Sequence, residues 1–481
     1  MMTLEEMNVC LGADIRTHLP GHMAGKAPVS FCHDSRAVEP GSLFVCLPGE
    51  RVDGHDFAAQ AAARGALAII AERDPFAGAE PPLPVIRVEN SRQALLELAE
   101  FWRGRTRARV VGVTGTAGKT SVKEVLAAAL ARHGKTAKNF LNMNSQIGLS
   151  ISILNAPLDA DYWVMEAGIS EERDMDELGR VLRPDLAVIV NVGQCHLSGL
   201  GGKGVAYHKA RLLAYLTKGG RALVNADYPE LVSECRVYPA ELKLFSSKRA
   251  SADYFVSYKG PASAATGRYL IHASDGSGAA AGRSEDFEVI APFRGSFGSE
   301  NVAAVAGAAH LLGLSREDLA AGLAGADMPR QRFSCQFFHN LAVIDDSYNS
   351  NPLSAPLMVE SAAEMAREKK LPLILVMGEM LELGDIACDM HRQLAKTMAE
   401  AGAAAVLWKG GQEKAVWDGL REGGFAGDFR VVQDESAFRE GMGELFKKRG
   451  KSGVVLFKGS RGTRLDPFVE IFQKEFCPAQ E

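Results

Sequence analysis

The sequence lacks the features that mark exported, zinc-knuckle or membrane-spanning proteins. Its eight cysteines among 481 residues form no CxxC pair, which argues against a zinc knuckle and a dense disulfide scaffold. No apolar run approaches the roughly 18–20 residues of a membrane helix. The acidic start, MMTLEEMNVC, has neither the basic nor the apolar region of an export signal. We therefore expect a cytoplasmic protein without membrane insertion.

A basic excess is also missing. The chain has 54 Lys and Arg against 59 Asp and Glu, a net charge of -5, whereas a generic nucleic-acid binder usually carries surplus positive charge. We therefore expect no nucleic-acid partner. Hydrophobic residues make up 47% and charged residues 23%, which is typical of a globular protein. At roughly 150 residues per domain, the length predicts about three domains.

Apolar runs and helical stretches alternate along the chain, which predicts an α/β fold. Runs such as 108–113, 162–165 and 186–192 are strand-like and are separated by helical segments. This alternation is typical of a mostly parallel sheet with helices on both faces. The predicted domains are a smaller α/β N-terminal domain, a central P-loop-type domain and a Rossmann-like C-terminal α/β domain, at 1–88, 89–328 and 329–481.

A glycine-rich loop follows the sharpest predicted strand and precedes a helix. It consists of Gly115, Thr116, Ala117, Gly118, Lys119, Thr120 and Ser121. Glycines let backbone N–H groups surround phosphate oxygens, and the helix N-terminus adds a positive dipole end. Lys119 can reach the terminal phosphates, and the Thr120 hydroxyl can bind Mg²⁺. The usual P-loop has a further glycine where Val113 stands here, so a glycine-rich turn with a solvated Lys119 is the alternative to mononucleotide binding.

A carboxylate lies at the end of another predicted strand. Glu166 follows the apolar run 162–165, and open α/β sheets bind ligands at the carboxyl ends of their strands. Beside a phosphate loop this carboxylate is a natural Mg²⁺ ligand. The alternative is a solvated glutamate without a ligand.

Two segments together resemble a known family. The loop TGTAGKTS and the segment DDSYNSNP at 345–352 are similar to motifs of the Mur ligases, ATP-dependent enzymes that form amide bonds in peptidoglycan precursor synthesis. The resemblance implies an ADP-forming ligase that uses ATP and Mg²⁺. The segment 345–352 favours the branch that joins D-Ala-D-Ala to UDP-MurNAc-tripeptide through an acyl phosphate. Alternatives are the sister branch that adds the third-position diamino acid, and a non-catalytic ATP-binding switch.

The resemblance also implies a catalytic metal site. The catalytic residues would be Lys119, Glu166, His196 and Lys209, and the metal ligands would be Thr120, Glu166, His196 and Lys209. In the family, CO₂ converts the lysine that aligns with Lys209 into a carbamate, which is an oxygen ligand. The loop before Lys209 is one residue shorter than usual, and Arg211 replaces the usual glutamate, so Lys203 or a solvated Lys209 are alternatives.

The remaining roles implied by the resemblance concern ligands. The ATP contacts would include Asn301, Asp346 and Arg332, with Arg330 as the alternative arginine. Phe297-Gly298 replaces the usual His-Asn pair near the adenine. The segment 458–461 resembles the family's KGSR. Residues expected at UDP-MurNAc-tripeptide or D-Ala-D-Ala, in a monomeric enzyme, are Ser35, Glu50, Arg51, His55, Asn142, Asn144, Tyr348, Asn349 and Asn351.

Overall fold

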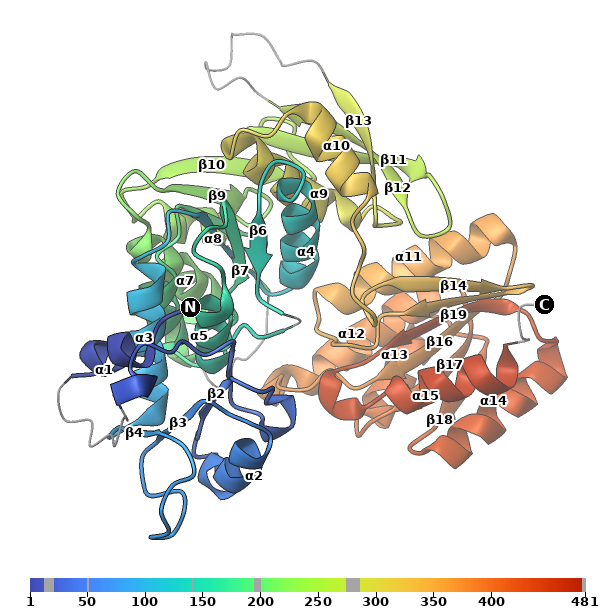
Figure 1. Cartoon of the computed structure of the whole chain (residues 1–481). Helices are drawn as coiled ribbons and strands as arrows, with labels where there is room; N and C mark the ends of the chain where they lie inside the picture. Colours follow the sequence, from blue (N-terminus) through green and yellow to red (C-terminus); the bar gives the residue numbers. More distant parts are fainter. Residues whose placement is uncertain (13–20, 50–51, 141, 194–199, 274–285, 478–481) are drawn as a thin grey trace.

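Three β-sheets follow one another along the chain, each covered by helices (Figure 1). The computed structural model describes residues 1–12, 21–49, 52–140, 142–193, 200–273 and 286–477. Within these ranges no helix is long and apolar enough to cross a membrane. The predicted α/β class is confirmed. The exact boundaries at 88/89 and 328/329 stay predictions.

The N-terminal sheet has four parallel strands in the order β1-β2-β3-β4. Its elements are α1 (Leu4–Cys10), β1 (Phe31–Cys32), β2 (Leu43–Val45), α2 (Ala58–Ala63), β3 (Ala68–Ala71) and β4 (Val85–Arg87). The Asn155 side chain joins this sheet to the next domain: Phe31 N–H donates to Asn155 Oδ1 at 2.8 Å, and Asn155 Nδ2 donates to the Phe31 carbonyl at 3.0 Å.

The central sheet has nine strands in the order β13-β12-β11-β10-β9-β8-β5-β7-β6. Strands from β6 to β11 pair in parallel, and β12 and β13 extend the sheet in antiparallel fashion. The strands are β5 (Arg109–Thr114), β6 (Thr136–Lys138), β7 (Tyr162–Glu166), β8 (Leu186–Ile189), β9 (Arg221–Asn225), β10 (Glu241–Ser246), β11 (Tyr254–Pro261), β12 (Gly267–Ala273) and β13 (Phe287–Ala291).

Helices cover both faces of the central sheet, as the sequence predicts. One buried apolar cluster includes Leu98, Leu154 and Leu178, and the other includes Val125, Val305 and Leu323. In β5, Val110 belongs to the first cluster and Val111 to the second, because neighbouring side chains of a strand point to opposite faces of the sheet. The helices are α3 (Ser91–Arg103), α4 (Lys119–Leu130), α5 (Gln146–Asn155), α6 (Asp174–Leu182), α7 (Gly204–Ala210), α8 (Pro229–Cys235), α9 (Gly298–Leu311) and α10 (Arg316–Ala324).

The C-terminal sheet has six strands in the order β14-β15-β19-β16-β17-β18, parallel except for the edge strand β14. Its strands are β14 (Ser334–Phe338), β15 (Leu341–Asp345), β16 (Leu373–Gly378), β17 (Ala403–Lys409), β18 (Asp428–Val431) and β19 (Gly453–Lys458). Its helices are α11 (Ser354–Lys369), α12 (Ala387–Glu400), α13 (Glu413–Glu422), α14 (Glu435–Arg449) and α15 (Asp466–Ile471).

Helix α11 fastens the C-terminal domain to the central one. Arg294, just after β13, forms an ion pair with Glu368, and the Ser361 hydroxyl donates to the Arg294 carbonyl at 2.7 Å. The Phe297 and Phe333 rings also meet, with centroids 5.0 Å apart. These contacts bring the loops at the carboxyl ends of both sheets to one place.

Candidate active site

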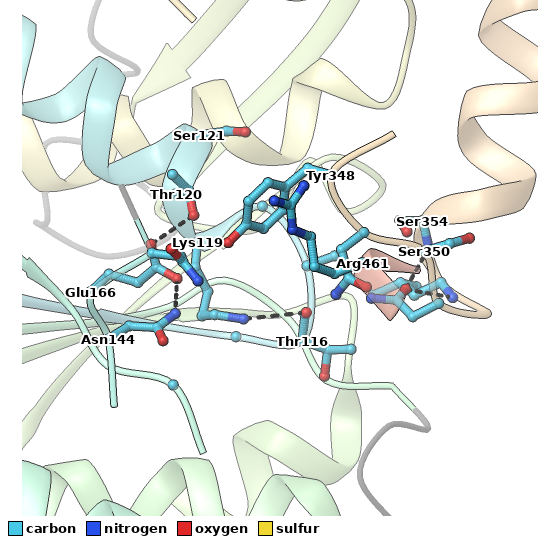
Figure 2. Close-up of a pocket in the computed structure, with 18 of the residues that line it drawn as sticks. Thr116, Lys119, Thr120, Ser121, Asn144, Glu166, Tyr348, Ser350, Ser354 and Arg461 are labelled. Atoms are coloured by element: carbon cyan, nitrogen blue, oxygen red, sulfur yellow. Dashed lines mark hydrogen bonds between the residues drawn. The ribbon is translucent and has the colours of Figure 1, made fainter. Parts of the chain in front are cut away.

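A cavity of about 750 Å³ lies between the central and C-terminal domains. One wall holds the phosphate loop and Glu166, and the other holds Tyr348 and Arg461 (Figure 2). The predicted site residues that line the cavity are Gly115, Thr116, Ala117, Gly118, Lys119, Thr120, Ser121, Asn142, Asn144, Glu166, Lys209, Asn301, Arg332, Asp346, Tyr348, Asn349 and Asn351.

The phosphate loop connects the end of β5 to the start of α4. Gly118 has φ +75°, and a Cβ there would lie 2.4 Å from Asn301 Oδ1, so both backbone conformation and space require glycine. Lys119 Nζ donates to the Thr116 carbonyl at 3.4 Å. The N-terminal end of α4 therefore meets the cavity beside a flexible cation, the arrangement that binds phosphate groups.

Glu166, at the end of β7, is a buried carboxylate of the cavity whose side chain and backbone are both held by hydrogen bonds. Thr120 Oγ1 donates to its Oε2 at 2.7 Å, and Asn144 Nδ2 donates to its Oε1 at 2.5 Å. Asn139 clamps the backbone: Glu166 N–H donates to Asn139 Oδ1 at 2.9 Å, and Asn139 Nδ2 donates to the Glu166 carbonyl at 3.1 Å. Asn139 is absent from the sequence-based site, because the short strand before it, β6, was not among the predicted strands.

The oxygens of Thr120 and Glu166 fit a magnesium ion. Mg²⁺ keeps several waters and takes one or two carboxylates together with substrate phosphates, so these two protein oxygens beside a phosphate loop are a suitable set. In the described part of the chain, no group of three or more His, Cys, Asp and Glu could hold a metal. His196 lies outside the described residues, so its predicted metal role stays a prediction.

Lys209 on α7 is buried, with 2% exposure, and lines the cavity. Its Nζ donates to the carbonyl of Gly115 in the phosphate loop at 2.9 Å. Lys203 is exposed and lies over the Tyr207 ring, with Nζ 4.5 Å from the ring centroid. Burial beside the loop favours Lys209 over Lys203 as the functional lysine.

Tyr348 is the centre of the opposite wall. The guanidinium carbons of Arg332 and Arg461 lie 4.2 and 5.9 Å from its ring centroid, within cation–π range. Burial raises the pKa of the Tyr348 hydroxyl, while the two arginines lower it and the negative charge of Glu166 raises it. The two arginines offer planar donors suited to phosphate oxygens. Arg461 is a site residue that the sequence-based set left out, although the segment 458–461 pointed to it.

Asp346 and Asn351 organise the loop that carries Tyr348. Asp346 accepts from Lys458 Nζ at 2.5 Å and from the Phe333 N–H at 3.0 Å. Asn351 Oδ1 accepts from the N–H groups of Leu353 and Ser354 at 3.1 and 2.9 Å, which caps α11. Their side chains thus fix this wall, and direct contact with ATP or substrate stays a prediction.

Ser35 and His55 are not among the residues that line this cavity. The Ser35 hydroxyl donates to Gln60 Oε1 at 2.7 Å. His55 Nε2 accepts from the Glu72 N–H at 2.9 Å, so its Nδ1 carries the proton and donates to Asp53 at 2.6 Å. Glu50 and Arg51 lie outside the described residues. Uridine binding by this domain stays a prediction.

Three family models match the chain in order. They describe the Mur ligase family catalytic domain at residues 30–103, the Mur ligase middle domain at 113–309 and the Mur ligase glutamate ligase domain at 331–461. Together they span the three sheets and both walls of the cavity.

Full-length relatives show the same likeness. The UDP-N-acetylmuramoyl-tripeptide–D-alanyl-D-alanine ligase of Escherichia coli K12 is 32% identical over 92% of this chain and 93% of its own. The protein of that name from Bacillus subtilis 168 is 28% identical over 91% of each.

Two solved structures share the fold. MurF from Acinetobacter baumannii has a TM-score of 0.82 and 25% identity, covering 98% of this chain and 99% of its own. The MurF ligase from Thermotoga maritima in complex with ADP has a TM-score of 0.76 and 26% identity, covering 93% and 97%. Similarity over nearly the full length of these proteins shows that the chain belongs to the Mur ligase family.

Proposed function

We propose that the protein is an ATP-dependent, ADP-forming ligase that joins D-Ala-D-Ala to UDP-MurNAc-tripeptide in peptidoglycan precursor synthesis. The observation that carries the proposal is the cavity, in which the phosphate loop and Glu166 face Tyr348, Arg332 and Arg461. The relatives' names support the choice of substrates. No comparison favours the sister ligase or a non-catalytic switch.

The proposed reaction has two steps. A carboxylate oxygen of the tripeptide attacks the γ-phosphorus of ATP, which forms an acyl phosphate and releases ADP. The neutral D-Ala-D-Ala amine then attacks the acyl carbon, and the tetrahedral intermediate expels inorganic phosphate as the nitrogen loses one proton and the amide forms. Neither step needs a covalent bond to the enzyme, so positioning and neutralisation of charge provide the catalysis.

The residues of the central domain hold the phosphates in this scheme. The phosphate-loop N–H groups and Lys119 bind the β- and γ-phosphates, and Thr120 and Glu166 would hold Mg²⁺. When bound, that ion neutralises part of the phosphate charge. The chain as a whole carries a net charge of -5 and so offers no general attraction for phosphates. Arg332 and Arg461 approach from the C-terminal domain and would bind phosphate oxygens of the nucleotide.

Lys209 has a separate role in the proposal. Addition of CO₂ to its neutral amine releases a proton and leaves a carbamate, which replaces a buried cation with an oxygen ligand. Its burial supports this role, because an ammonium group is costly to bury. We assign His196 to the same metal site, on the family resemblance alone.

The other substrate contacts extend the proposal beyond the nucleotide. Asn142 and Asn144 line the cavity on the central-domain side, where the tripeptide carboxylate must approach the γ-phosphate. Tyr348, Asn349 and Asn351 would face the incoming dipeptide. Ser35, Glu50, Arg51 and His55 would lie near the uridine diphosphate, and the enzyme would act as a cytoplasmic monomer.

Phosphate release tests the function. The protein, ATP and Mg²⁺ are incubated with UDP-MurNAc-tripeptides that end in diaminopimelate or lysine, each with and without D-Ala-D-Ala. We expect sustained release only when a tripeptide and the dipeptide are both present. Phosphate release at the same rate with and without D-Ala-D-Ala would contradict the proposed substrates.

A further inference from the structure

A chain of hydrogen bonds connects helix α9 to the phosphate loop through Asn191. This asparagine lies just after β8 and is 3% exposed. Its Oδ1 accepts from the backbone N–H groups of Thr116 and Ala117 at 3.0 and 2.8 Å. Its Nδ2 donates to the carboxylate of Glu300, in the first turn of α9.

The partners at the two ends fix the orientation of the Asn191 amide. Two N–H donors meet one end, so that end must be the oxygen, and a carboxylate meets the other end, so that end must be the NH₂ group. Rotating the amide by half a turn would set donors against donors and an oxygen against the carboxylate. Glu300 therefore reinforces the orientation in which Oδ1 of Asn191 meets the loop.

Glu300 is itself held from other elements. The Tyr228 hydroxyl, just before α8, donates to Glu300 Oε2 at 3.2 Å. The Asn225 side chain at the end of β9 lowers the pKa of the carboxylate, and the charge of Asp227 raises it, so both lie nearby. The carboxylate is thus fixed by the carboxyl end of the central sheet, while the residue still lines the cavity.

The next residue of α9 touches the same loop. Asn301 lies so close to Gly118 that a Cβ there would meet its Oδ1 at 2.4 Å. The first turn of α9 thus meets the loop at two points, directly at Gly118 and through Asn191 at Thr116 and Ala117. Because Asn191 occupies two N–H groups at the start of the loop, it shapes the backbone that leads into the N-terminus of α4.

We propose that Glu300 is a positioning residue for nucleotide binding. It acts through Asn191 to hold the phosphate loop in the conformation that binds phosphate groups. The inference rests on the proposed function only for the identity of the nucleotide. The proposal predicts that residue 300 needs an oxygen that accepts a hydrogen bond from Asn191, but does not need a negative charge. Glutamine at position 300 should therefore preserve nucleotide binding. A loop ordered in advance binds its ligand with a smaller entropic cost.

The test compares Glu300→Ala with Glu300→Gln and a matched control, Glu317→Ala, which removes an exposed acid in the first turn of α10. Calorimetry measures ADP affinity with Mg²⁺, and steady-state kinetics give KM for ATP, UDP-MurNAc-tripeptide and D-Ala-D-Ala. We expect Glu300→Ala to weaken ADP binding and raise KM for ATP about tenfold, the size of one hydrogen bond to a charged group. The other two KM values should stay unchanged, and Glu300→Gln should restore affinity.

Wild-type ADP affinity in Glu300→Ala, failure of Glu300→Gln to restore it, or an equal rise of all three KM values would each overturn the proposal. If Glu300→Ala does not fold, Asn191→Asp provides a second test, because it places a carboxylate against that of Glu300. Unchanged ADP affinity in Asn191→Asp would refute the proposed link through Asn191. A wild-type protein that binds ADP but forms no amide would contradict the proposed function and leave the role of Glu300 intact, because that role is tested by ADP binding.

Discussion

The two walls of the cavity are built in different ways. On the central-domain wall, Thr120 and Asn144 both donate to Glu166, which ends β7 and is 1% exposed. On the C-terminal wall, Tyr348 lies between two arginines, of which Arg461 is exposed. The central wall is ordered in advance, whereas the opposite wall presents cations on loops.

This difference separates two tasks. A preordered, buried wall suits the placement of phosphate and metal, because its groups need no rearrangement when charge develops. A wall that presents arginines on loops suits binding of the ligand, because each arginine contributes a separate contact to it. Substitutions in the central wall should therefore reduce kcat, and those in the opposite wall should mainly raise KM.

Lys119→Ala gives the largest expected effect. It removes the cation that meets the terminal phosphates, so kcat for phosphate release should fall by roughly 1,000-fold, the upper range for loss of one charge-stabilising group. Lys135→Ala is the matched control, since Lys135 is an ion-paired lysine outside the cavity lining. A near-normal kcat in Lys119→Ala would show that the central wall does not contribute to catalysis.

Lys209→Ala tests the buried lysine of the same wall. We expect kcat to fall by roughly 100-fold and to recover in part when a short carboxylate such as acetate is added, because the acid can occupy the place of the carbamate. Lys203→Ala, which removes the exposed lysine of the same region, should retain activity. Full activity of Lys209→Ala without added carboxylate would refute the carbamate.

Arg461→Ala tests the opposite wall. Loss of one charged donor should raise KM for ATP by about tenfold while kcat changes less. Arg439→Ala, an ion-paired arginine on the outer helix α14, serves as the control. A fall in kcat with KM unchanged would show that this wall acts in the transition state and would remove the contrast between the walls.

The smallest expected effect is a pH-dependent change in stability at Glu300. Burial raises the pKa of its carboxyl from the ordinary 4.5 to about 7. Between these values the folded state holds more proton than the unfolded state, so stability falls as pH rises through this window. The Tm advantage of Glu300→Gln over the wild type should therefore be larger at pH 8 than at pH 4.5, by about 2 °C or more. Calorimetric melting at both pH values measures it, and an equal difference would contradict the raised pKa.

The sequence predicted the central wall better than the opposite wall, for a physical reason. The phosphate loop and Glu166 follow strong apolar runs, so local pattern and strand order place them at one edge of a parallel sheet. Arg332, Tyr348 and Arg461 are brought together by the folding of the C-terminal sheet, where β15 and β19 are neighbours despite their separation in the chain.

Two kinds of feature were beyond local reasoning. Asn139 and Glu300 act through hydrogen bonds between segments far apart in the sequence, which local patterns do not show. The antiparallel extension of β12 and β13 also depends on pairing between strands, which the local pattern does not give. The three-domain α/β fold itself was predicted correctly, because strand and helix periodicities are local.

Product analysis tests the central claim most directly. The protein is given ATP, Mg²⁺ and UDP-MurNAc-tripeptide together with equal D-Ala-D-Ala and free diamino acid, and the UDP-linked products are identified by mass spectrometry. A parallel reaction supplies UDP-MurNAc-dipeptide instead of the tripeptide. We predict UDP-MurNAc-pentapeptide as the product in the first reaction and no conversion in the second. Conversion of the dipeptide to a tripeptide, with D-Ala-D-Ala left unused, would contradict the account.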